Sequence, residues 1–238
     1  MGLHRQTVNI KKDFFELQAW NNQEFIIGID EVGRGCFAGP VVAAAVILPI
    51  NKKHRMLKDS KEMTPQERET AFLWIQKNCL YGIGVIHHRF IDEYNIVQAT
   101  KAAMIKATLN VLQITPKRPS AIIIDAMPLD LCQTAFHDIA VHSFIKGESK
   151  SSSIAAASIT AKVVRDHMMN TLDPLVPGYG WSSNKGYGTP FHRAAIHSHE
   201  HSILHRQKFL QKLWQQRVNE DEQLSLFFDK TETTTLNG

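Results

Sequence analysis

Two adjacent carboxylates stand at the end of an apolar run near the start of the chain. Asp30 and Glu31 follow the apolar letters "FIIGI", and a third carboxylate, Asp125, ends the run "AIIID". A carboxylate is costly to bury without a partner, and carboxylates that lie close together raise one another's pKa unless a cation holds them. Asp and Glu without Cys or His at metal-binding spacing favour a hard ion, Mg²⁺ or Mn²⁺.

A fourth acid lies in a helical pattern. Ser158, Lys162 and Asp166 recur every four residues, which places them on one face of an expected helix. For Asp166 taken alone, we favour an ordinary ion pair with Lys162. For Glu31 and Asp125 taken alone, a structural role and a metal-binding role are equally supported.

The loop "GRG" follows the first two acids almost directly. Gly33 and Gly35 permit a positive φ and let a ligand come close to the backbone, whose amides can bind sugar or phosphate oxygens. Arg34 adds a guanidinium that suits phosphate. An ordinary tight turn explains Gly-x-Gly equally well. We exclude a dinucleotide-binding loop, because two carboxylates would repel a pyrophosphate unless metal intervened and no helix follows.

Composition limits the classes of protein to consider. The 238 residues are 43% apolar, which is enough for a folded core and suits one domain. No apolar run reaches the roughly 18 residues that a membrane helix needs, and the N-terminus lacks the apolar block of a signal peptide. Three cysteines without CxxC spacing indicate a reduced environment. We therefore expect a cytoplasmic monomer.

Charge is unevenly distributed along the chain. The net charge is +4, but residues 218–238 hold five acids and one base, which leaves +8 on residues 1–217. A basic body with an acidic tail favours a polyanionic partner such as nucleic acid. The same charge could also serve solubility alone. We divide the chain into an N-terminal extension (1–22), a body with C-terminal helices (23–217) and an acidic tail (218–238).

Apolar patterns predict the elements that position the acids. The expected strands are "FIIGIDE", "GPVVAAAVILP", "LYGIGVIHH", "SAIIIDA" and "IAVHSFI". The first two fit an antiparallel hairpin, whereas the later strands need crossovers and should lie parallel to their neighbours. Expected helices cover residues 64–78, 90–113 and 151–169, and positions near 190–198 and 206–217. Thr64, Pro65 and Glu67 form a capping-box pattern at the start of the first of them.

This order of elements predicts an α/β fold, a mixed sheet flanked by helices. Asp30 and Asp125 would meet at the carboxyl ends of adjacent strands, where sites form in such sheets. Residues 173–190, rich in Gly, Pro, Ser and Asn, read as a loop.

Five blocks of the sequence together resemble the ribonuclease HII family. They are "GIDEVGRG" with "GPVVAAAV", then "LKDSKEMTPQERE", "IIIDA", "KGESKSSSIAAASITAKVVRD" and "NKGYGTPFH", in the family's order over residues 26–192. The related HIII type lacks the arginine of "GRG". The resemblance implies a ribonuclease H-like fold with a helical C-terminal extension.

The resemblance also implies a role for each matched residue. The acids that would bind two metal ions and carry catalysis are Asp30, Glu31, Asp125 and Asp166. The "GRG" residues Gly33, Arg34 and Gly35 would contact the 2′-hydroxyl of a ribonucleotide and the adjoining phosphate, and Tyr187 would stack on the next deoxyribose. The lysines expected on phosphates are Lys61, Lys150 and Lys185, although each alone could be a surface charge.

The implied activity is hydrolysis of the RNA strand of RNA–DNA hybrids and cleavage 5′ to ribonucleotides embedded in duplex DNA. It would leave a 3′-hydroxyl and a 5′-phosphate, use two Mg²⁺ or Mn²⁺ ions and serve ribonucleotide removal in DNA repair and replication. Two other functions remain open. Another DNA endonuclease of the same fold would share the acids without needing "GRG" or Tyr187. A non-catalytic nucleic-acid or clamp adaptor would explain the charge and the tail but not the four acids.

Two positions depart from the family pattern. Cys36 and Phe37 replace the usual Pro-Leu after "GRG", and Glu148 stands where Asp is common in the "KGD" block. We expect these changes to affect loop rigidity and fine tuning rather than activity. For Cys36 we favour an inert buried thiol over a reactive one.

Two further patterns lie near the C-terminus. His197, His201 and His205 recur every four residues, which would make a zinc face if helical. Without a clear fourth ligand, we favour a surface or helix-end cluster. In the tail, Gln223 to Phe227 resembles the pentapeptide by which bacterial proteins dock on the DNA polymerase sliding clamp; the residues concerned are Gln223, Leu224, Leu226 and Phe227. The alternative is a segment that folds back on the body.

Overall fold

The centre of the molecule is a five-stranded mixed sheet. The computed structural model describes residues 11–125, 127, 129–131, 134 and 136–211. The strands are β1 (Ile26–Val32), β2 (Val41–Ile47), β3 (Leu80–Ile86), β4 (Ala121–Asp125) and β5 (Ala140–Phe144), arranged in the order β3-β2-β1-β4-β5. β1, β2 and β3 pair antiparallel, whereas β4 runs parallel to β1 and β5 parallel to β4. This confirms the predicted mixed sheet.

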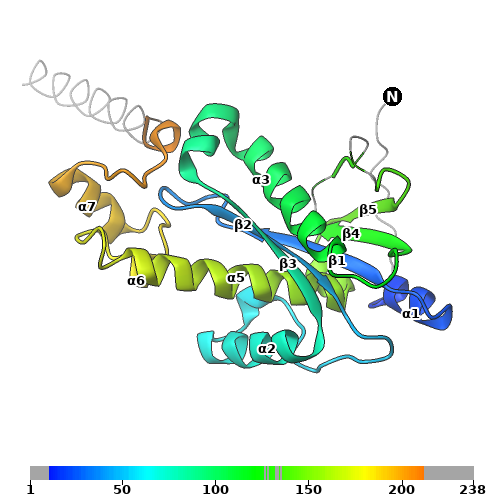
Figure 1. The fold of residues 1–238 in the computed structure, drawn as a ribbon. Coiled ribbons are helices and arrows are strands. Elements are labelled where there is room, and N and C mark those ends of the chain that lie inside the picture. Colours follow the sequence, from blue (N-terminus) through cyan, green and yellow to red (C-terminus); the bar gives the residue numbers. More distant parts are fainter. Residues whose placement is uncertain (1–10, 126, 128, 132–133, 135, 212–238) are drawn as a thin grey trace, which may run out of the picture.

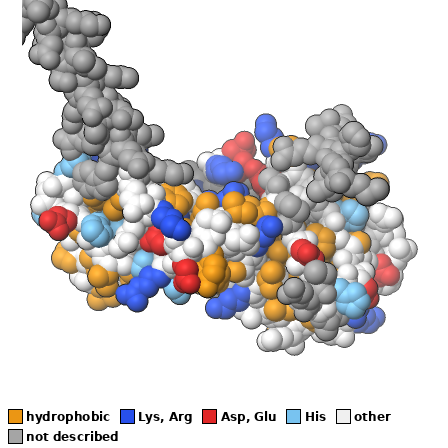
Figure 2. All heavy atoms as spheres, turned by 90° about the horizontal axis from the view of Figure 1, so that it is seen from above, with side chains coloured by type: hydrophobic (Ala, Val, Ile, Leu, Met, Phe, Trp, Pro, Cys, Tyr) orange, Lys and Arg blue, Asp and Glu red, His pale blue; other side chains and the backbone are white. Residues whose placement is uncertain are grey.

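Helices cover both faces of this sheet. They are α1 (Phe14–Asn21), α2 (Pro65–Asn78), α3 (His88–Leu112), α4 (Gly147–Lys150), α5 (Ser152–Leu172), α6 (Trp181–Asn184) and α7 (Pro190–His199), with a 3₁₀ turn, η1 (Ser60–Glu62). α3 lies on one face, and α5 with α2 on the other (Figure 1). Seen from the α3 side, basic and acidic side chains are interspersed with hydrophobic ones (Figure 2).

The central strands are apolar on both sides because each side faces a separate core. In β2, Val41, Ala43 and Ala45 belong to the core under α3. Val42 and Ala44 belong to the core under α5 and α2. This two-sided burial is the reason that the strands read as continuous apolar runs rather than as alternating ones.

α5 packs on β1 at backbone contact distance. A Cβ built on Gly28 would lie 2.2 Å from the carbonyl carbon of Ser153, so only glycine fits there. Because the two backbones touch at this point, the following turns of α5 lie alongside the C-terminal half of β1. As a result, Ser158 on α5 lies within hydrogen-bonding distance of Asp30 on β1.

The predicted capping box of α2 is confirmed. The Thr64 side chain accepts a hydrogen bond from the Glu67 N–H (3.2 Å), and the Glu67 carboxylate accepts one from the Thr64 N–H (2.7 Å). Two of the otherwise unpaired N–H groups at this helix start are thereby satisfied.

α1 is an element that the sequence did not predict. Asp13 and Glu16 are buried, and their carboxylates accept hydrogen bonds from the Ser152 N–H (2.8 Å) and the Ser153 N–H (3.0 Å). Negative charge at a helix N-terminus is favourable. The first turn of α5 is therefore capped by another part of the chain, so the described part of residues 1–22 packs against the sheet domain.

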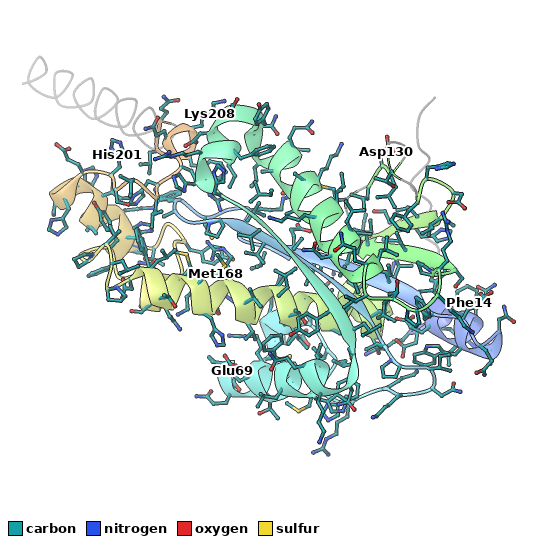
Figure 3. All side chains as sticks on the ribbon, in the orientation of Figure 1. Phe14, Glu69, Asp130, Met168, His201 and Lys208 are labelled. Atoms are coloured by element: carbon teal, nitrogen blue, oxygen red, sulfur yellow. The ribbon has the colours of Figure 1, made fainter. Side chains whose placement is uncertain are left out.

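Helix α1 and the segment that follows α7 lie at opposite ends of the molecule. Phe14 on α1 lies at one end, and His201, which follows α7 in the chain, lies at the other (Figure 3). The segment expected as a loop contains the short helix α6, and residues 207–211 are again helical.

In the part of the chain that the structure covers, no helix is both long and apolar enough to cross a bilayer. The clamp-like residues 223–227 lie outside the described residues.

Candidate active site

Two strands bring the first and third acids to one edge of the sheet. The parallel pairing of β1 with β4 ends at Ile29 and Ile124, and Asp30 and Asp125 are the next residues on their strands. β1 stays paired with β2 through Val32, one residue beyond the strand end that the sequence predicted. The carboxyl ends of β1 and β4 therefore present their acids together, as expected.

Asp30 is the most buried of the predicted acids. It is 8% exposed, and its carboxylate accepts hydrogen bonds from the Glu31 N–H (2.8 Å) and from the Ser158 hydroxyl. Burial, together with the charges of Glu31 and Asp125, raises its pKa well above the ordinary value. A cation at this position would relieve the repulsion among these acids.

Glu31 lies between the acids and the "GRG" loop. Its Oε1 accepts a hydrogen bond from the Arg34 guanidinium at 3.2 Å. Burial raises the pKa of Glu31 although Arg34 opposes that shift. Its Oε2 is buried and has no hydrogen-bond partner. One oxygen of Glu31 is thus left available inside the site.

Glu148, on α4, is the site residue that sequence reasoning did not assign. It is 6% exposed and shares a side-chain hydrogen bond with Asp125, while Lys61 lies 3.7 Å away. Burial and Asp125 raise the pKa of Glu148 to about 7, and its Oε2 has no partner. The available signal was the "KGE" block, in which Glu148 replaces the family's usual Asp.

Asp166 lies apart from these four acids. It follows Ser158 by two turns of α5, about 12 Å along the helix axis. Its carboxylate pairs with Lys162 at 2.8 Å, and its charge acts on Lys185 and Tyr187. The ion-pair interpretation of Lys162 and Asp166 is confirmed, and Asp166 belongs to the surroundings of Tyr187.

The two glycines of the "GRG" loop differ in what they permit. Gly33 has a φ of +91°, and a Cβ there would meet the Arg165 side chain at 2.3 Å. Gly35 has an ordinary φ, and a Cβ there would meet nothing within 4 Å. Packing within the protein therefore requires glycine at 33, whereas the space over Gly35 is open to a ligand.

Two buried arginines hold the loop that follows the acids. Arg165 donates to the carbonyls of Ala38, Pro40 and Lys185 (3.1, 2.9 and 2.7 Å). Arg206 donates to the carbonyls of Arg34 (2.9 Å) and Gly39 (2.9 and 3.1 Å). Both are fully buried, and sequence reasoning assigned neither a role. Their guanidiniums fix the backbone of residues 34–40.

Tyr187 lies directly beside this loop. Cys36 and Tyr187 form an isolated antiparallel bridge, and their side chains are hydrogen-bonded. Tyr187 is 38% exposed, and the side-chain cations of Lys162 and Arg165 each lie 5.8 Å from its ring centroid. Cys36 is fully buried, as predicted, and burial raises the pKa of its thiol, which disfavours the reactive thiolate.

The predicted lysines lie on both sides of the acids. Lys185 donates to Asn170 and to the Ser182 carbonyl near Tyr187. Lys61 lines a groove of about 640 Å³ next to Glu148, and the other lysines of that groove are Lys12, Lys58 and Lys146. Lys150 is next to this groove in the chain, and its carbonyl accepts from Asp13. The groove also contains acids, Asp59 and Glu62 among them.

The zinc face that His197, His201 and His205 would form is not present. α7 ends at His199, where Glu200 takes a positive φ of +62°, so the three side chains do not share a helix face. His205 is buried rather than on the surface. Its ring contacts His192 instead, which the sequence pattern did not indicate.

The acids present oxygen donors of the kind that a divalent ion binds. Among the described residues, no three His, Cys, Asp or Glu side chains stand in a ready metal-binding arrangement. Here Glu31 is turned toward Arg34, and Glu148 toward Asp125. The donor set nevertheless suits a hard cation, because it is all carboxylate and leaves Glu31 Oε2 and Glu148 Oε2 buried without partners.

Comparison with known proteins gives the family. Residues 27–216 match the family described as ribonuclease HII. The ribonuclease HII of Alkaliphilus metalliredigens is 43% identical over 202 residues, which is 83% of this chain and 96% of that protein. The ribonuclease HII of Listeria monocytogenes is 46% identical over 187 residues, 78% of this chain and 68% of that protein.

Solved structures agree on the fold. The structure of the PCNA:RNase HII complex from Archaeoglobus fulgidus matches with a TM-score of 0.62 at 26% identity, covering 76% of this chain and 93% of that one. The ribonuclease H2 of Pyrococcus horikoshii matches with a TM-score of 0.60 at 23% identity, covering 77% and 93%. The fold is thus the expected ribonuclease H-like one, and this chain belongs to the ribonuclease HII family of endonucleases.

Proposed function

We propose that this protein is a metal-dependent endoribonuclease that cuts the RNA strand of RNA–DNA hybrids and cuts 5′ to ribonucleotides embedded in duplex DNA. The products would carry a 3′-hydroxyl and a 5′-phosphate, and the activity would serve ribonucleotide removal during repair and replication. The observation that supports this most is the buried carboxylate cluster, with two unpartnered oxygens, beside a backbone that is open at Gly35.

In this proposal Asp30, Glu31, Asp125 and Glu148 hold the metal. Glu148 replaces Asp166 as the fourth acid, because Glu148 contacts Asp125 whereas Asp166 lies two turns along α5 with Lys162. When bound, Mg²⁺ or Mn²⁺ supplies Lewis acidity to the scissile phosphate and lowers the pKa of a bound water. No protein nucleophile is needed.

The remaining residues bind and orient the substrate. The open backbone at Gly35 lets a sugar approach, which suits a test for the 2′-hydroxyl that separates RNA from DNA. Arg34 and Gly33 complete this loop, and Tyr187, which is 38% exposed, would stack on the neighbouring sugar. Lys61, Lys150 and Lys185 contact phosphates on the two sides of the acids.

One labelled duplex tests the reaction and the substrate together. A DNA duplex with a single ribonucleotide is incubated with the protein and EDTA, Mg²⁺ or Mn²⁺, beside an all-DNA duplex. We expect metal-dependent cleavage 5′ to the ribonucleotide and an intact control. Cleavage of the control would favour a general DNA endonuclease. Absence of cleavage with both metals, from a folded protein, would favour a non-catalytic adaptor.

The choice of the fourth acid has its own test. We expect Glu148→Gln to raise the metal concentration needed for half-maximal cleavage by about tenfold, in the range seen when an interaction at a metal site is lost. Asp166→Asn should leave that concentration unchanged and weaken substrate binding instead. The opposite result for the two variants would return the fourth position to Asp166.

A further inference from the structure

Two buried histidines are not explained by metal binding or by contact with substrate. His192, on α7, is 0% exposed, and His205, in the segment after α7, is 2% exposed. Their Nε2 atoms are 3.0 Å apart, so the two rings share one hydrogen bond. The rings of Tyr179 and Trp181 enclose His205, at centroid distances of 4.8 and 6.0 Å.

The direction of this hydrogen bond is fixed by the neighbouring groups. The Ser202 backbone N–H lies 2.9 Å from His205 Nδ1, and a backbone N–H can only donate. His205 Nδ1 is therefore the acceptor, so the proton of neutral His205 is on Nε2 and is donated to His192 Nε2. Burial lowers the pKa of both histidines, that of His205 to about 4, which keeps the pair neutral.

The chain of hydrogen bonds ends on Tyr187. Because His192 Nε2 accepts, its proton is on Nδ1, which lies 2.9 Å from the Tyr187 carbonyl. The same carbonyl accepts from the Thr189 N–H (2.8 Å), while the Tyr187 N–H donates to the Asn184 carbonyl (2.9 Å). The backbone of Tyr187 is thus held on both sides while its ring reaches the surface.

The same pair is connected to residues 34–40, the loop that begins within "GRG" and that the two buried arginines hold. Ala38 and His205 form an antiparallel bridge, as Cys36 and Tyr187 do. The Gly39 N–H donates to the Leu204 carbonyl at 3.0 Å. Hydrogen bonds therefore join three segments into one unit: residues 34–40, the loop of Tyr187 and the segment around His205. The hydrogen bond between the two histidines connects the last two of these segments.

We propose that His192 and His205 are positioning residues that set the Tyr187 ring against the "GRG" loop, and so determine how firmly the sugars at an RNA–DNA junction are held. This inference rests on the proposed function, in which Tyr187 stacks on the substrate. Neither histidine touches substrate; each acts through the Tyr187 carbonyl.

Two substitutions of His192 by amide side chains test its two hydrogen bonds separately, the one to the Tyr187 carbonyl and the one to His205. The amide of His192→Asn reaches about as far as Nδ1 and can still donate to the Tyr187 carbonyl. The amide of His192→Gln reaches about as far as Nε2 and leaves that carbonyl without its donor. We expect His192→Gln to lower kcat/KM on the single-ribonucleotide duplex about tenfold, mainly through KM, the equivalent of about 1.4 kcal/mol. His192→Asn should recover most of this loss, and exposed His137→Gln is the matched control.

A double-mutant cycle distinguishes positioning from a general effect on the fold. If His192 acts through Tyr187, the tenfold loss should shrink to about twofold or less when His192→Gln is made in a Tyr187→Ala protein. Thermal unfolding of each variant establishes that it is folded. Losses that multiply in full, or wild-type kinetics of folded His192→Gln, would overturn the proposal.

A second measurement does not depend on catalysis. Long-range ¹H–¹⁵N correlation spectra of the full chain report which ring nitrogen carries the proton. We expect the Nδ1–H form for His192 and the Nε2–H form for His205, and loss of the His192 signature in His205→Ala. The opposite forms would overturn the proposal. If the wild-type protein cleaves no ribonucleotide duplex, the proposed function fails, and these spectra still decide whether the pair holds Tyr187.

Discussion

The glycines at positions 33 and 35 look alike in the sequence but have different physical requirements. Gly33 is needed by the protein itself, since its φ is positive and Arg165 occupies the space of a Cβ. Gly35 is needed by nothing that the structure places near it. The open space above Gly35 is the observation behind our proposal that substrate approaches the backbone at that position.

Alanine substitutions should separate the two requirements. We expect Gly35→Ala to keep or slightly raise the unfolding temperature, because it reduces the entropy of the unfolded chain, yet to lower cleavage at least tenfold. Gly33→Ala should destabilise the protein by about 1–3 kcal/mol, because of its positive φ and the contact with Arg165. Thermal unfolding and the ribonucleotide-duplex assay measure both. Full activity of Gly35→Ala would contradict the role of this backbone in substrate recognition.

Titration of His205 should be visible in stability. Its pKa is lowered in the folded protein, so the unfolded chain binds more protons between its ordinary pKa and about 4. Stability should therefore fall as pH decreases from about 6.5 to about 4, by at most about 1.4 kcal/mol per pH unit for this group. Urea unfolding across this range measures the slope. His205→Gln should flatten it, and an unchanged slope would contradict the neutral buried pair.

At the scale of elements, the sequence predicted what local patterns determine. The apolar runs identified all five strands, and Thr64 with Glu67 identified the start of α2. Asp30 and Asp125 could be paired because both end strands that a crossover must make parallel. These inferences need only the periodicity of apolar residues and the general rules for how successive strands are connected.

The sequence could not predict features that depend on contacts between distant residues. α1 is held by Asp13 and Glu16 at the start of α5, more than 130 positions away. Glu148 joins the acids only because α4 follows β5 beside β4. Arg206 reads as a surface charge until its partners, Arg34 and Gly39, are known. Tertiary packing, which no local pattern records, decides each of these positions.

The capping of α5 by α1 gives a prediction for stability. Glu16 accepts hydrogen bonds from the Ser151 hydroxyl (2.5 Å) and the Ser153 N–H while buried at 1% exposure. We expect Glu16→Ala to lower the free energy of unfolding by about 1–3 kcal/mol, since it leaves buried donors unpaired at a helix start. Urea unfolding measures the change, with exposed Glu24→Ala as the control. Equal stability of the two variants would mean that α1 contributes nothing to α5.

At the scale of the whole molecule, charge divides the sequence into a basic body, residues 1–217, and an acidic tail, residues 218–238. We propose that the body holds nucleic acid and that Gln223 to Phe227 bind the bacterial sliding clamp.

Deleting residues 218–238 should separate these tasks. We expect the shortened protein to cleave the ribonucleotide duplex at the wild-type rate and to lose binding to the clamp. Surface plasmon resonance with immobilised clamp measures the second effect, and Leu226→Ala with Phe227→Ala in the full chain is the finer variant. Clamp binding that survives both changes would place the contact elsewhere on the body.

The two buried arginines have a consequence for how this protein can change over evolutionary time. Arg165 and Arg206 bind main-chain carbonyls in residues 34–40, and every amino acid provides a carbonyl. These contacts to the loop backbone do not depend on the side chains at positions 36 and 37. Cys36 and Phe37 could therefore replace the family's usual pair while the backbone kept its course. A change of side chain at Cys36 or Phe37 leaves these carbonyl contacts in place, whereas a change of Arg165 or Arg206 removes them.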